Sequence, residues 1–165
     1  MKPTFIQSPL WLIAILTLFT TCGHDQDAGE TPSPADIYIT IDSEGVLAYA
    51  QPGDEVPDFI SMYNGEADYQ ARTHGAANLV TELVPGQQVN WILEQHEGLK
   101  IVGFDFQVLE GDDFFSAPVV QPDGSWTTDV APDAAIGSVI KYSVLFEING
   151  QQYWWDPLAK ISTST

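Results

Sequence analysis

The chain has 165 residues, of which 44% are hydrophobic and 12% aromatic, a composition typical of a globular domain rather than a disordered chain. Five Lys and Arg against 23 Asp and Glu give a formal net charge of −18. This charge excludes nucleic acid as a partner, because phosphates need basic side chains to neutralise them. The single cysteine, Cys22, excludes an intramolecular disulfide.

Residues 1–21 have the layout of a signal peptide. Lys2 precedes an apolar run at residues 10–19, which is too short for an ordinary transmembrane helix, and Cys22 follows closely. An apolar run that ends at a cysteine resembles a bacterial lipoprotein signal, in which cleavage leaves Cys22 as a lipidated N-terminus. Two positions just before the cysteine depart from the usual pattern of such signals. An ordinary secretory signal and an uncleaved N-terminal anchor are therefore the alternatives.

Residues 22–35 form the next segment, which is acidic and contains Gly and Pro. It is predicted to be an extended tether that holds a folded domain at residues 36–165 away from a lipid bilayer. We therefore expect a membrane-anchored lipoprotein of the bacterial cell envelope, in the outer membrane, with the membrane as partner. A secreted or periplasmic protein is the alternative.

Short apolar–polar alternations between turn residues predict strands along the whole domain. The expected strands lie at residues 36–42, 46–50, 59–63, 78–84, 88–94, 99–109, 125–128 and 139–148, with a last one after Gly150. Residues 66–77 give no clear pattern. No sustained helical period occurs after Cys22. The pattern favours an all-β fold, namely a single β-sandwich of immunoglobulin-like or jelly-roll-like type with about seven to nine strands.

The C-terminal hairpin is the most specific of these predictions. Asn149 and Gly150 suit a two-residue type I′ turn, in which both central residues need positive φ. This turn places Leu145 opposite Trp154. Opposed residues share a face of the sheet. One face is therefore predicted to be core, and it carries Ile140, Tyr142, Val144, Phe146, Ile148, Tyr153 and Trp155.

The opposite face of the hairpin is mixed, and it supplies the candidate contact residues Trp154, Lys141 and Leu145. An exposed tryptophan there could stack on a sugar ring or anchor a protein partner. The alternative is that a loop or the second sheet covers this face.

No catalytic constellation is visible in the sequence. It contains no Gly-x-Ser-x-Gly nucleophile elbow, and neither His74 nor His96 has a local partner. Glu94 and His96 share a face if the strand continues, so they are the weak candidates for a metal site. We expect no enzymatic activity, no cofactor and no metal.

Four segments occur in the order seen in one known family: ITIDSEGVLA at 39–48, GAANLVTELVPGQQVNW at 75–91, GDDFFSAP at 111–118 and YWWDP at 153–157. Together they resemble the AidA/PixA inclusion-body protein family over about residues 37–161. The chain departs from that family at residues 85–87, which read Pro-Gly-Gln where the family has Val-Gly-Asp.

The resemblance implies a small β-sandwich protein with no catalytic residue to carry over. Some members of that family are abundant in bacterial cytoplasmic inclusions or are associated with host colonisation, and the export signal here departs from the cytoplasmic pattern. We therefore expect a non-catalytic, exported, lipid-anchored β-sandwich module. A carbohydrate-binding domain that uses exposed aromatics and a self-assembling protein are the alternatives, and the sequence leaves the oligomeric state open.

Overall fold

The computed structural model describes residues 31–64, 80–94 and 97–163, which belong to a compact unit spanning Thr31–Thr165. Strands dominate the described residues, with one short α-helix and one 3-10 helix. In chain order the elements are β1 (Ala35–Ile41), α1 (Ser43–Tyr49), η1 (Pro57–Phe59), β2 (Ile60–Asn64), β3 (Val80–Leu83), β4 (Gln88–Leu93), β5 (Leu99–Glu110), β6 (Val119–Val120), β7 (Trp126–Asp129), β8 (Val139–Ile148), β9 (Gln151–Trp155) and β10 (Leu158–Ile161).

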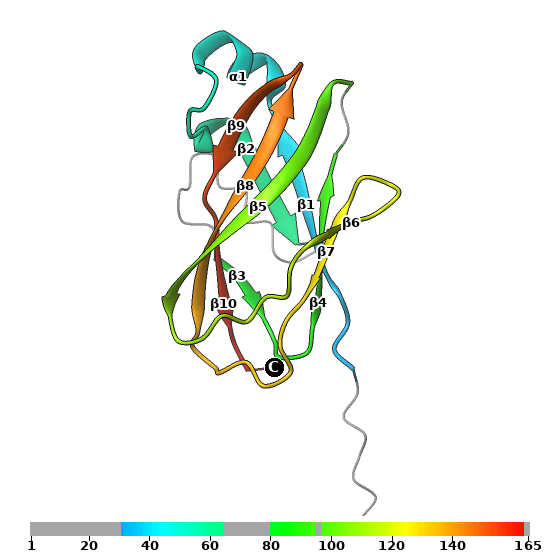
Figure 1. The fold of residues 1–165 in the computed structure, drawn as a ribbon, viewed down its shortest axis with the longest axis vertical. Helices are drawn as coiled ribbons and strands as arrows, with labels where there is room; N and C mark the ends of the chain where they lie inside the picture. The colour runs from blue at the N-terminus through cyan, green and yellow to red at the C-terminus, as the bar shows by residue number, and fades with distance from the viewer. Residues whose placement is uncertain (1–30, 65–79, 95–96, 164–165) are drawn as a thin grey trace, which may run out of the picture. The chain divides into compact units, whose positions relative to one another are not determined.

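The strands form two mixed sheets (Figure 1). The first sheet has the order β2-β1-β4-β7-β6, and the second has the order β3-β10-β8-β5, with β9 also paired to β8. The pairs β1–β4 and β3–β10 are parallel, whereas the hairpin β8–β9 and the long pair β5–β8 are antiparallel. The fold is therefore all-β, as the sequence predicts.

One hydrophobic core holds side chains from both sheets, so the arrangement is sandwich-like. Ile37 and Trp91 of the first sheet belong to it, as do Tyr142 and Phe146 of the second. The rings of Trp91 and Tyr142 lie with centroids 5.6 Å apart. Burial alternates strictly along β1 and β8, because successive side chains of a strand point to opposite faces.

The C-terminal hairpin has the predicted register. Leu145 pairs with Trp154, and Val144 pairs with Trp155. Asn149 has φ 50° and Gly150 has φ 82°, as a type I′ turn requires. All seven side chains predicted to be core on this hairpin are buried.

The predicted strand at residues 46–50 is wrong, because most of this segment belongs to helix α1. The Asp42 side chain caps the helix, with the Gly45 N–H donating to its Oδ1 at 2.9 Å. Val46 is the buried residue of the helix. Over five residues, apolar alternation and a short helix look alike, and here the capping carboxylate favours the helix.

Strand β10 is an element that the sequence prediction missed. Asp156 and Pro157 interrupt the chain after β9, and β10 then pairs with the first half of β8. Strands β9 and β10 therefore follow one another along the same partner. The unclear stretch at 66–77 lies outside the described residues.

Candidate functional site

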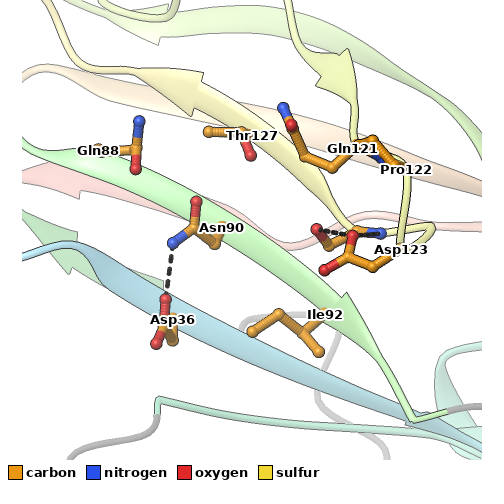
Figure 2. A pocket seen from close by; sticks show the side chains of 9 residues that line it. Asp36, Gln88, Asn90, Ile92, Gln121, Pro122, Asp123 and Thr127 are labelled. Carbon is orange, nitrogen blue, oxygen red and sulfur yellow. Dashed lines mark hydrogen bonds between the residues drawn. The ribbon is translucent and has the colours of Figure 1, made fainter.

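The outer face of the first sheet carries a hollow of about 630 Å³ that is open to solvent (Figure 2). It is formed by β1, β4, β7 and the turn between β6 and β7. Its lining residues are Asp36, Gln88, Asn90, Ile92, Gln121, Pro122, Asp123, Ser125 and Thr127. These side chains point outward because their strand neighbours, such as Ile37, Val89 and Trp91, are buried in the core.

Two hydrogen-bonded groups fix the polar lining. Asp36 and Asn90 are register partners on the parallel strands β1 and β4, and the Asn90 Nδ2 donates to Asp36 Oδ1 at 2.7 Å. Figure 2 shows the Asn90 carbonyl oxygen on the other side of the amide, away from Asp36. Asp123 Oδ1 accepts from the Ser125 Oγ at 2.7 Å and from its backbone N–H at 3.0 Å. The hydroxyl of Ser125 thereby lowers the pKa of Asp123.

An aromatic row continues the same face toward the edge of the sheet. Tyr63 of β2 pairs with Tyr38 of β1, and Tyr38 pairs with Ile92 of β4, which lines the hollow. The two tyrosine rings are stacked, with centroids 5.0 Å apart and planes 12° apart. Both tyrosines are half-buried. The outer face therefore carries the polar hollow and, beside it, a stacked pair of tyrosines, across the strands β4, β1 and β2.

Glu94 lies next to Tyr63 and binds its hydroxyl group. It accepts from the Tyr63 hydroxyl and from Thr40 Oγ1, each at 2.6 Å. The hydrogen bond to Glu94 raises the pKa of Tyr63. Glu94 is one of the two weak metal candidates, and the other, His96, lies outside the described residues. No cluster of three metal-ligating side chains occurs within the described ranges.

The three predicted contact residues lie together on the second sheet, but each is partly covered. Trp154 is half-buried, and its indole Nε1–H donates to the Gly53 carbonyl at 3.0 Å. The Lys141 ammonium pairs with Asp156, a buried carboxylate that also accepts from Ser143 Oγ at 2.6 Å. This ion pair and hydrogen bond hold Lys141 against the sheet.

A loop lies along the outer edge of β9 beside these residues. In this segment, residues 51–56, the Gly53 N–H donates to the Gln152 carbonyl at 2.7 Å and the Val56 N–H donates to the Trp154 carbonyl at 3.0 Å. This loop borders Trp154 at the edge of the sheet, and a contact role for Trp154 stays a prediction. Cys22 and the signal layout lie outside the described residues. Within the part of the chain that is described, no helix is long and apolar enough to cross a membrane.

Sequence reasoning missed the outer face of the first sheet. Its only local signal is the alternation that puts Asp36 and Asn90 outside. Their meeting depends on the parallel pairing of β1 with β4, which brings together residues 54 positions apart. A turn motif fixes a hairpin, whereas no short motif fixes a parallel pair.

Comparison with known proteins gives a likeness in fold. The sequence matches no family profile and no curated protein. Among solved structures it is similar to the crystal structure of an inclusion body protein, PixA, from Burkholderia cenocepacia J2315, with a TM-score of 0.58 and 16% identity. The match covers 82% of this chain and 99% of that chain. The chain thus has a PixA-like fold.

Proposed function

We propose that the protein is a non-catalytic binding module of the bacterial cell envelope. It is a single β-sandwich domain, exported through residues 1–21, attached to the membrane through lipidated Cys22 and held off the bilayer by the tether at 22–35. The domain presents the outer face of its first sheet to a ligand. The PixA-like fold supports the relation to the inclusion-body proteins.

The observation that carries the binding role is the preformed polar hollow on that face. Its volume of about 630 Å³ lies within the range of ordinary ligand pockets. Asp36, Asn90 and Asp123 are already held in place by hydrogen bonds, so little conformational entropy is lost when a ligand binds. Polar side chains fixed at a concave surface are the usual source of orientation and specificity in binding sites.

Metabolic labelling with a clickable palmitate analogue tests the membrane anchor. The wild-type chain should take up label and Cys22→Ala should not, because the cysteine thiol is the acceptor of the lipid. Thr21→Ala is the matched control, and it should keep the label because the cysteine remains. Equal labelling of all three chains would contradict the anchor.

Self-assembly is the second candidate function, and one observation favours it. Val119 and Val120 form the short edge strand β6 and are 59% and 55% exposed. Exposed apolar residues on a strand edge promote pairing with another copy, and a lysine there opposes it. Light scattering after size-exclusion chromatography should show a wild-type oligomer that Val120→Lys converts to monomer. A monomeric wild type at high concentration would contradict this candidate.

A further inference from the structure

We infer that the outer face of the first sheet binds an uncharged oligosaccharide, with one sugar ring in the polar hollow and the next over Ile92 and Tyr38. This inference rests on the binding role proposed above and names its ligand class. The surface differs from the Trp154 face, where the sequence suggested sugar stacking. Three properties of the outer face lead to it, namely its chemistry, its charge and its shape.

The chemistry of the lining suits hydroxyl groups. Sugar hydroxyls donate and accept at once, and so do carboxamides and side-chain hydroxyls. The hollow offers three carboxamides and two hydroxyls: Gln88, Asn90, Gln121, Ser125 and Thr127. Because Asn90 donates to Asp36, its carbonyl oxygen is oriented as an acceptor for a ligand hydroxyl.

The charge of the hollow disfavours anionic ligands. None of its nine lining residues is basic, and the chain carries a net charge of −18, so phosphates, sulfates and uronic acids are repelled. Its two carboxylates, Asp36 and Asp123, already accept hydrogen bonds from lining donors. They orient the amide of Asn90 and the turn at Ser125 and remain charged acceptors, which suit the hydroxyl donors of a neutral sugar.

The shape of the face suits a chain of sugars. The hollow is open, and apolar surface lies within it at Ile92 and Pro122. The row Ile92–Tyr38–Tyr63 runs across β4, β1 and β2. The C–H-rich face of a pyranose ring packs on an aliphatic side chain such as Ile92, and the stacked pair Tyr38 and Tyr63 extends this apolar surface, while the hydroxyl rim of the sugar bonds to polar neighbours. A ligand that lies across the strands would use both parts of the face.

Depletion isotherms on polysaccharide-coated beads test the inference with the full-length protein in a polyoxyethylene detergent. The probes are dextran, galactomannan and xylan as neutral chains and chitosan as a cationic one. The wild type should bind at least one neutral polysaccharide, with equal affinity at low and high salt because no ion pair is involved. Asn90→Ala and Gln88→Ala should each weaken that affinity about three- to tenfold, the effect of one lost hydrogen bond.

Gln107→Ala is the matched control, since Gln107 is also an exposed glutamine on a strand but lies on the second sheet. It should bind as the wild type does, and near-UV circular dichroism should show all four proteins equally folded. Binding that is unaffected by Asn90→Ala and Gln88→Ala would overturn the site. Binding of chitosan alone, lost at high salt, would overturn the neutral ligand and indicate a basic partner.

The outcomes separate this inference from the proposed function. Failure to bind any neutral polysaccharide overturns the inference that the ligand is an oligosaccharide. The membrane anchor is decided separately, by palmitate labelling of Cys22. Cleavage of a bound polysaccharide into shorter chains would confirm that the ligand is a sugar and would contradict the non-catalytic role.

Discussion

Trp154 and Trp155 are neighbours in the chain but lie on opposite faces of β9. Trp155 is buried in the core, whereas Trp154 is half-buried beside the loop at 51–56. We expect Trp155→Ala to lower the free energy of unfolding by about 3–5 kcal/mol, because it leaves a cavity in the core. Trp154→Ala should cost about 1–2 kcal/mol, since it loses one hydrogen bond to Gly53 and partial packing. Chemical denaturation measures both, and the reverse order would contradict the face assignment.

The loss of folding stability at alkaline pH depends on Tyr142. Burial raises the pKa of Tyr142 from 10.0 to about 12. Below pH 10 both states keep the phenol proton, and above it only the unfolded state releases that proton. Stability should therefore fall between pH 10 and pH 12, by at most about 1.4 kcal/mol per pH unit. The hydrogen bond to Asp156 raises the pKa of Lys141, which adds a loss of the same sign.

Urea denaturation of Tyr142→Phe across this pH range tests the assignment. The variant should be within about 1 kcal/mol of the wild type at pH 7, because the Tyr142 hydroxyl has no hydrogen-bond partner among the described residues. It should also lose part of the alkaline decline. Tyr49→Phe is the control, since Tyr49 is 81% exposed. If the free energy of unfolding of Tyr142→Phe falls with pH as steeply as that of the wild type, other groups control the alkaline loss of stability.

For single residues, the sequence predicted correctly which side of the strand each hairpin residue faces, but it left open whether a loop or a sheet covers Trp154. Alternation along the hairpin assigned Trp155 to the core and Trp154 to the other side, because a strand has a period of two. The cover over Trp154 comes from Gly53, 101 residues away in the chain. Likewise, the neighbours of Lys141 include Asp156, which a local pattern could not identify as its buried partner.

The turn at Gly150 determines the register of the second sheet's hairpin. Gly150 has φ 82°, and a β-branched residue resists that conformation. Gly150→Val should therefore lower the melting temperature, with a cost of about 1–2 kcal/mol. Gly103→Val is the matched control, because Gly103 lies in β5, has no positive φ and has open space around its Cβ position. Equal melting temperatures for the two variants would contradict the role of the turn.

Elements fixed by local chemistry were predictable, and those fixed by distant partners were not. The hairpin β8–β9 follows from Asn149 and Gly150, and most other strands follow from alternation. Strand β10 was missed because Pro157 looks like an end, although pairing with β3 and β8 continues the sheet beyond it. The candidate site was missed for the same reason, since it forms where β1 meets β4 in parallel.

The charge of the whole molecule sets a salt dependence. A net charge of −18 destabilises the compact state by self-repulsion. Salt weakens this repulsion, because at 0.1 M it limits the range of electrostatic interactions to about 10 Å. Raising sodium chloride from about 0.05 to 0.5 M should therefore raise the melting temperature by a few degrees. Sodium sulfate is not a suitable substitute, because it also strengthens hydrophobic burial. A lower melting temperature in sodium chloride would indicate that ion pairs outweigh the repulsion.

Strand β10 has a consequence for the timing of folding. It is the last described strand in the chain, yet it lies between β3 and β8 in the second sheet. During synthesis at about 5–20 residues per second, β3 must wait several seconds for Leu158–Ile161 to arrive before its parallel partner exists. Until then β3 lacks the strand that links it to the second sheet, whereas β5, β8 and β9 can pair without β10. A chain that is exported unfolded would therefore complete its second sheet only after residues 158–161 have crossed the membrane.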